Sequence, residues 1–173
     1  MSNINLYNCI ESIIDFPKKG ILFRDISPLL ANFEAISELR NIFLNEALKY
    51  KIDYVAGIDA RGFLFSTLLS QDLKVGSILI RKPDKLPGEL YTRTYKLEYG
   101  ESNLSIKKSL DIKNKNIILI DDLLATGGTL KCAEDLINDN GGNVTLSMVV
   151  IELVSLKGRH KLSSNFYSVL KYD

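Results

Sequence analysis

The stretch from Ile117 to Thr129 constrains the fold of this chain more than any other. It opens with four apolar residues at 117–120 that do not alternate with polar ones, a pattern typical of a strand buried on both faces of a parallel sheet. Asp121 and Asp122 follow, then a short turn, and then apolar residues at helical spacing that stop at Asn140. The order of strand, turn and helix predicts an α/β protein with a parallel sheet.

The turn after the two carboxylates has the composition of a phosphate-binding loop. Glycines let the backbone approach an anion, the N–H groups at a helix N-terminus point toward it, and threonine hydroxyls add donors. An ordinary tight turn would explain a Gly-Gly pair alone, but not the whole string. The chain has no G-x-x-x-x-G-K-[ST] motif, which disfavours an NTP-hydrolysing P-loop. The residues expected to bind phosphate are Ala125, Thr126, Gly127, Gly128 and Thr129.

The neighbouring carboxylates need a separate reason, because carboxylates repel phosphate. Two acceptors beside a phosphate loop suit the 2′- and 3′-hydroxyls of a ribose, so we expect a ribose 5-phosphate to lie across the turn. If the leaving group is pyrophosphate, Mg²⁺ joins it and nearby acidic charge becomes useful. The alternative is that Asp121 and Asp122 merely end a strand. In both cases we expect them to face solvent and to contribute little to stability.

The string Asp-Asp-Leu-Leu-Ala-Thr-Gly-Gly-Thr at 121–129 closely resembles the phosphoribosyl-diphosphate signature of type I phosphoribosyltransferases. The resemblance extends from Phe16 to Tyr172 and implies the type I fold, an open, mostly parallel sheet flanked by helices. It also implies one domain over 1–173, with a small base-binding hood at about 16–30 and a flexible flap at about 82–95. Mg²⁺ would be held mainly by substrate and water, near the two aspartates.

Two further strands are expected to bring basic residues to the same edge of the sheet. Strand 54–58 runs into the turn 59–63 and a helix that continues to Leu73, and strand 76–80 runs into a basic loop. In an open parallel sheet such turns share one edge, where ligands bind. A solvated surface loop is the alternative for the charge run. The resemblance assigns to the diphosphate the residues Arg61, Arg81, Lys82 and Lys85.

The resemblance also implies which residues handle the acceptor base. The segment 16–28 is similar to the hood of family members that take adenine, where backbone faces the edge of the base. The segment Leu-Glu-Tyr-Gly at 97–100 matches one whose Glu and Tyr close over the site. We therefore expect Glu98 to be catalytic and Tyr99 to belong to the flap. The expected adenine-binding residues are Leu22, Phe23, Arg24 and Leu153, the last of which is equally well explained as core.

The remaining pattern predicts further elements. Apolar spacing indicates amphipathic helices over 6–14 and 33–48. An apolar run indicates a central strand over 144–153. The pattern at 167–172 indicates an edge strand.

Composition excludes several classes of protein. The 173 residues suit one domain, and a net charge of +1 gives no reason to expect nucleic-acid or membrane binding. Cys9 and Cys132 fit neither a metal spacing nor a disulfide framework. His160 is the only histidine, so His-based triads are nearly excluded. No signal peptide or long apolar run is present, and a reducing cytoplasm is the expected setting.

The family activity implied is transfer of a phosphoribosyl group from 5-phosphoribosyl 1-diphosphate to N9 of adenine, giving AMP and diphosphate. A homodimer is implied by the resemblance alone. Two alternatives stay open: transfer to another base, or a non-catalytic regulator that senses phosphoribosyl diphosphate and binds DNA. The second needs an added DNA-binding module, for which neither length nor charge leaves room.

Overall fold

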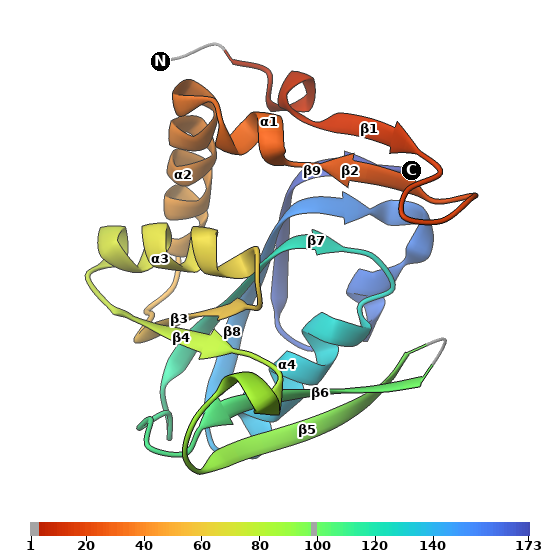
Figure 1. Cartoon of the computed structure of the whole chain (residues 1–173). Helices are drawn as coiled ribbons and strands as arrows, with labels where there is room; N and C mark the ends of the chain where they lie inside the picture. Colours follow the sequence, from red (N-terminus) through yellow and green to blue (C-terminus); the bar gives the residue numbers. More distant parts are fainter. Residues whose placement is uncertain (1–3, 98–99) are drawn as a thin grey trace. The chain divides into compact units, whose positions relative to one another are not determined.

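The computed structural model describes residues 4–97 and 100–173 (Figure 1). Within the described part, the chain divides into two compact units, 1–42 and 43–173. The single domain expected over 1–173 stays a prediction.

The first unit contains short elements and most of one long helix. Its elements are η1 (Leu6–Cys9), β1 (Glu11–Ile14), β2 (Leu22–Asp25), α1 (Ser27–Leu30) and the start of α2 (Phe33–Ala47), which crosses into the second unit. The α2 helix confirms the helix expected over 33–48.

The helix expected over 6–14 is wrong. Only a 3₁₀ turn forms there, and the chain then enters β1, which pairs antiparallel with β2 from Glu11 opposite Asp25 to Ile14 opposite Leu22. β-Branched isoleucines favour a strand over a helix. Ile14 is 77% exposed, so the apolar spacing did not mark a buried helix face. The Arg24 guanidinium donates to the Ser12 hydroxyl across the pair.

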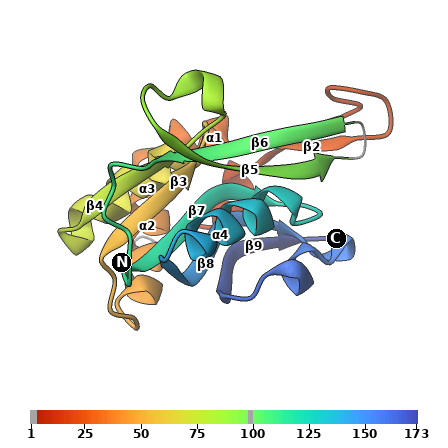
Figure 2. The ribbon, with the colours of Figure 1, turned by 90° about the horizontal axis from the view of Figure 1, so that it is seen from below.

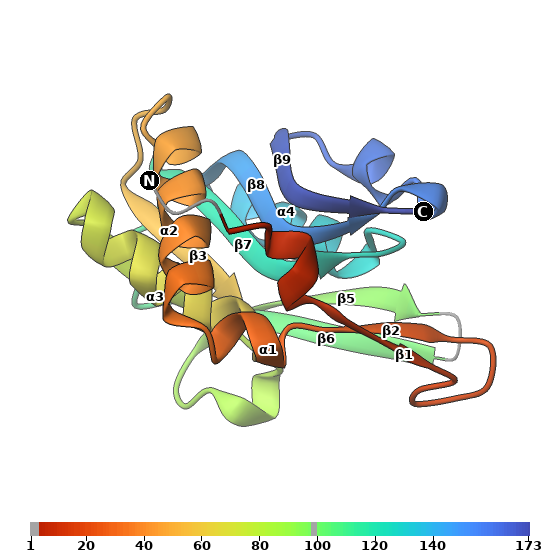
Figure 3. The same ribbon diagram turned by 90° about the horizontal axis from the view of Figure 1, so that it is seen from above.

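The second unit is built on a five-stranded parallel sheet in the order β4-β3-β7-β8-β9 (Figure 2). Helices α3 and α4 cover opposite faces of this sheet (Figures 2 and 3). The sheet confirms the α/β class. The helices and strands of this unit are β3 (Tyr54–Ile58), α3 (Gly62–Leu73), β4 (Gly76–Ile80), η2 (Pro83–Lys85), β5 (Leu90–Leu97), β6 (Gly100–Lys107), β7 (Asn116–Leu124), α4 (Gly128–Asp139), β8 (Asn143–Leu153), η3 (Val154–Leu156), η4 (Gly158–Lys161) and β9 (Asn165–Tyr172).

Strand β7 lies at the centre of the sheet and positions the signature string. Its residues 117–120 are fully buried, as their lack of alternation predicted. The strand is longer than expected, because Asp121, Leu123 and Leu124 still pair with β8. The two carboxylates therefore belong to the strand, and sheet pairing fixes their backbone.

The predicted flap over 82–95 contains η2 and the first part of an antiparallel hairpin formed by β5 and β6. Tyr91 and Tyr95 pack against the core of the unit. Arg93 pairs with Asp135, at 3.1 Å, and with Asp139, both on α4. The part of the flap from residue 90 onward is thus a strand docked on α4, and whether the segment moves stays a prediction.

Candidate functional site

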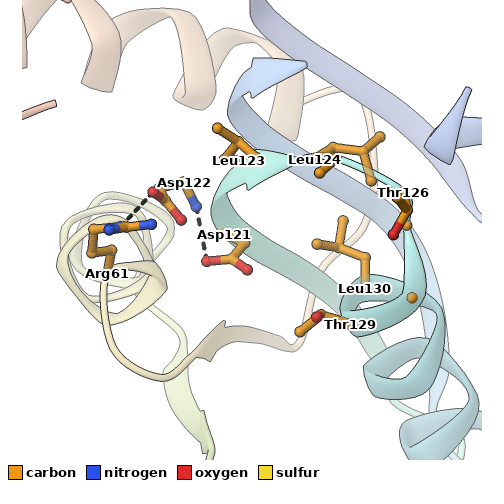
Figure 4. A pocket seen from close by; sticks show the side chains of 11 residues that line it. Arg61, Asp121, Asp122, Leu123, Leu124, Thr126, Thr129 and Leu130 are labelled. Carbon is orange, nitrogen blue, oxygen red and sulfur yellow. Dashed lines mark hydrogen bonds and ion pairs between the residues drawn. The ribbon is translucent and has the colours of Figure 1, made fainter. Parts of the chain in front are cut away.

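The carboxyl end of β7 and the start of α4 line an open pocket of about 220 Å³ (Figure 4). Most of its lining comes from the signature string, and Arg61 comes from the turn before α3. Pockets for whole drug-sized ligands usually measure about 300–1,000 Å³, so this one suits a sugar phosphate. It is lined by Arg61, Asp121, Asp122, Leu123, Leu124, Ala125, Thr126, Gly127, Gly128, Thr129 and Leu130.

The phosphate loop, residues 125–129, leads into helix α4, which begins at Gly128. Gly127 is the residue before the helix and has a φ of 81°, a left-handed conformation that favours glycine. The free N–H groups of the first helical turn lie at this end of α4, so the loop presents donors and a positive dipole end. The Thr129 hydroxyl lies 3.3 Å from the hydroxyl of Tyr95 on β5. These groups can bind a phosphate dianion.

The two carboxylates lie in different settings. Asp122 is buried, with 6% of the residue exposed, and its Oδ2 lies 2.5 Å from Arg61 Nε. Asp121 accepts the backbone N–H of Asp122 at 2.9 Å. Burial raises the pKa of Asp121 well above its usual range, and the neighbouring Asp122 charge acts in the same direction. The expectation that both carboxylates face solvent is therefore wrong for Asp122.

A second charged cluster lies at the carboxyl ends of β3 and β4. Asp59 receives Arg81 Nε at 3.1 Å and Lys85 Nζ at 3.3 Å. Burial alone would raise the pKa of Asp59, but the bonds from the two cations outweigh burial and lower it. One carboxylate therefore holds two cations in place at this edge of the sheet.

The structure brings together most of the residues expected from the sequence, in two groups. Arg61 and the signature residues share the pocket, while Arg81 and Lys85 share Asp59. Lys82 is exposed at the start of η2.

The residues expected to contact the base are placed separately. Leu22, Phe23 and Arg24 lie on β2 in the first unit, and Leu153 is half-buried at the end of β8. Glu98 and Tyr99 lie outside the described residues.

Sequence reasoning missed several contributors to the site. Leu123 and Leu124 line the pocket, and their place inside the signature string was an available signal. Asp59 ends a core strand, but nothing local marks it as the partner of cations 22 and 26 residues away. Tyr95 reaches the loop only through the fold of the hairpin.

The donor set suits a hard divalent cation that keeps most of its ligands from substrate and water. Asp121 and Asp122 supply carboxylate oxygens, which Mg²⁺ prefers, and Mg²⁺ sites commonly use one or two protein carboxylates plus substrate phosphates. Among the described residues, no group of three or more His, Cys, Asp or Glu side chains could hold a metal. The chain therefore offers part of a Mg²⁺ site at the pocket and no complete protein cage in the described ranges.

Two further findings concern the residues that the structure describes. Burial raises the pKa of the Cys132 thiol to about 11, so this buried cysteine is not a nucleophile at neutral pH. Within the ranges the structure describes, no helix is both long and apolar enough to span a bilayer.

The fold and the pocket define an α/β protein with a pocket suited to a phosphorylated sugar at the carboxyl edge of a parallel sheet. Comparisons with known proteins give the family. The phosphoribosyl transferase domain family matches residues 28–171. Adenine phosphoribosyltransferase of Mus musculus is 46% identical over 168 residues, which cover 95% of this chain and 93% of the relative. The enzyme of that name from Prochlorococcus marinus strain NATL1A is 45% identical over 170 residues, 97% of this chain and 99% of the relative.

Solved structures give the same result. Adenine phosphoribosyltransferase from Thermoanaerobacter pseudethanolicus superposes with a TM-score of 0.93 at 39% identity, covering 96% of this chain and 98% of that one. The Saccharomyces cerevisiae enzyme, complexed with D-2,5-dideoxy-2,5-imino-altritol 1,6-bisphosphate and adenine, has a TM-score of 0.90 at 37% identity, covering 95% and 96%. The chain belongs to the phosphoribosyltransferase family, with its type I fold, and its relatives group it with the adenine phosphoribosyltransferases.

Proposed function

We propose that this protein transfers the 5-phosphoribosyl group of 5-phosphoribosyl 1-diphosphate to N9 of adenine, giving AMP and diphosphate. The observation that carries the proposal is the single pocket that combines a carboxylate pair with a phosphate loop at the end of β7. The similarity to adenine phosphoribosyltransferases over nearly the whole chain supports adenine as the base and purine salvage as the role.

In the reaction, the bond from ribose C1 to the diphosphate oxygen breaks, the bond from C1 to adenine N9 forms, and N9 loses a proton. The transition state resembles an oxocarbenium ion. Asp121 and Asp122 accept hydrogen bonds from the 2′- and 3′-hydroxyls, while the loop 125–129 binds the 5-phosphate. Holding the sugar at both ends orients C1 for attack and lowers the entropic part of the barrier.

The departing diphosphate gains negative charge as the C1–O bond breaks. Arg61, Arg81 and Lys85 lie at the carboxyl edge of the sheet, where they can stabilise that charge together with the exposed Lys82. Mg²⁺, held by the substrate and water near the aspartates, supplies Lewis-acid stabilisation of the diphosphate when it is bound. Asp122 pairs with Arg61, and this pairing keeps a cation within reach of the sugar.

The base is proposed to be read mainly by the backbone of 22–24, with Leu153 against its face. A backbone carbonyl would accept from the 6-amino group of adenine and an N–H would donate to N1. Glu98 is proposed to take the N9 proton or to stabilise developing positive charge, and Tyr99 to close over the site. A homodimer in the cytoplasm is the proposed working state.

The decisive experiment incubates the protein with 5-phosphoribosyl 1-diphosphate, Mg²⁺ and each of several bases in turn, and measures nucleotide formation. Hypoxanthine reverses both polar contacts, each costing on the order of 1–3 kcal/mol. We therefore expect AMP, with discrimination against hypoxanthine of roughly a hundredfold or more in kcat/KM. Leu22→Ala should weaken adenine binding through lost packing, yet keep the preference. Equal efficiency with hypoxanthine would exclude the adenine assignment, and a lack of any nucleotide would exclude the activity.

A further inference from the structure

A segment remote in sequence packs directly behind the phosphate loop. Gly158, buried at the start of η4, contacts the loop through backbone alone. A Cβ added to Gly158 would overlap the Ala125 carbonyl oxygen and would lie 2.8 Å from the Gly127 nitrogen. In the other direction, a Cβ on Gly127 would lie 2.5 Å from the Gly158 oxygen. The two backbones therefore leave no space for any side chain between them.

The residues that follow η4 are hydrogen-bonded to α4, the helix that follows the phosphate loop. Glu134, on α4, is completely buried, and its carboxylate accepts the Ser163 N–H at 3.1 Å and the Ser164 N–H at 2.5 Å. Lys131 Nζ lies 3.5 Å from the same carboxylate. A buried carboxylate is tolerated only with such partners, so these contacts fix the position of this segment on α4.

We propose that Gly158 is a positioning residue for the phosphate loop, and that Glu134 holds the segment that carries it. The backbone of Gly158 packs against the loop and restricts the conformations that the loop can adopt. The Ala125 carbonyl oxygen lies against the Gly158 backbone. The free N–H groups of the first turn of α4 are left to bind the anion. This inference rests on the proposed function, since it concerns how the 5-phosphate is bound.

The first test is Gly158→Ala. Because backbone atoms crowd the added methyl, relief requires the loop to move, and a shift of about 1 Å at a substrate-positioning element costs about a hundredfold in rate. We expect kcat/KM for 5-phosphoribosyl 1-diphosphate to fall by about a hundredfold. The affinity for ribose 5-phosphate, measured by titration calorimetry, should weaken as well. The KM for adenine should stay unchanged, a split that general destabilisation would not produce.

Gly142→Ala is the matched control. A Cβ there would lie 2.7 Å from Ile137 Cγ2, so it is also crowded, but it follows the opposite end of α4. We expect this variant to lose thermal stability while its affinity for ribose 5-phosphate stays at the wild-type value.

Glu134→Gln keeps the test decisive if Gly158→Ala does not fold. The substitution preserves size but removes the charge that the two N–H groups bind, so the affinity for ribose 5-phosphate should weaken in the same direction by a smaller factor. If Gly158→Ala folds and binds ribose 5-phosphate with wild-type affinity, the positioning role is overturned. If only Glu134→Gln folds, wild-type affinity in that variant overturns it. A wild-type protein that forms no AMP would instead overturn the proposed function.

Discussion

Two places on the carboxyl edge of the same sheet carry opposite charge arrangements. At the end of β7, two carboxylates, Asp121 and Asp122, share one nearby arginine, Arg61. At the ends of β3 and β4, one carboxylate, Asp59, is shared by two cations. The pKa of Asp121 is raised, mainly by burial, while that of Asp59 is lowered by its cations. The carboxyl ends of parallel strands thus place two carboxylates beside one arginine at β7, and two cations around one carboxylate at β3 and β4.

The largest effect is expected for Asp122→Asn. Loss of an acceptor for the sugar hydroxyls should reduce kcat by orders of magnitude. Because Asp122 is buried and paired with Arg61, the variant should also lose on the order of 1 kcal/mol of stability, measured by denaturant unfolding. Asp135→Asn is the control, since it also removes an arginine-paired carboxylate but lies on α4 outside the pocket. Wild-type kinetic constants in Asp122→Asn would show that the carboxylate pair at β7 does not bind the sugar.

Arg81→Gln tests the pair of cations around Asp59. We expect the KM for 5-phosphoribosyl 1-diphosphate to rise by about tenfold to a hundredfold, because one charge-assisted contact contributes roughly 1.5–3 kcal/mol. The KM for adenine should not change. Arg93→Gln removes an arginine that pairs with α4 and serves as the control. If both variants raise the KM equally, the cluster around Asp59 has no special role in binding the diphosphate.

Asp121→Asn should separate stability from activity. The folded-state pKa of Asp121 lies above its ordinary value of 3.8, so the folded protein binds this proton more tightly than the unfolded chain does. Its favourable contribution is complete below the unfolded pKa and is lost as pH rises through the folded pKa. Asparagine does not ionise, so the variant should melt a few degrees above wild type at neutral pH, while transferring far less phosphoribosyl group. The difference in Tm between Asp121→Asn and wild type should disappear in acid. A difference that does not depend on pH would contradict burial of a charged carboxylate at Asp121.

The smallest effect concerns the loop between β4 and β5. Trypsin should cut first within 82–93, at the exposed Lys85–Leu86 bond. Substrate with Mg²⁺ should slow that cut by a few-fold, because diphosphate would engage the basic residues of the loop. Cutting at the same rate with and without substrate would indicate that this loop is a fixed surface feature.

Much of the sheet could be predicted from the sequence, because strands buried on both faces lose their alternation. Residues 117–120 and 144–153 show this plainly, and both are central strands. The first helix could not be predicted correctly, since Ile10, Ile13 and Ile14 have helical spacing, but Ile13 and Ile14 pair with β2 as part of a strand. Strand β6 was not expected, because polar residues interrupt the apolar alternation that would mark a strand in the sequence.

The site was predictable where it is continuous in sequence and not where it depends on the fold. The string 121–129 carries both carboxylates and the loop, so the pocket follows from one stretch. Asp59 and Gly158 act on residues more than 20 positions away, through an ion pair and a backbone contact. No local pattern encodes either interaction.

The extension of β7 through the two aspartates limits how this chain can change in length. Side chains alternate sides along a strand, so one inserted residue within 117–120 would exchange the directions of Asp121 and Asp122. Paired hydrogen bonds to β8 would hold that wrong register in place. Insertions and deletions should therefore be lethal to activity inside the strand and tolerated in the connection 108–115 that precedes it. We expect length variation in this part of the molecule to be confined to the connection before β7, at the end of the strand away from the pocket.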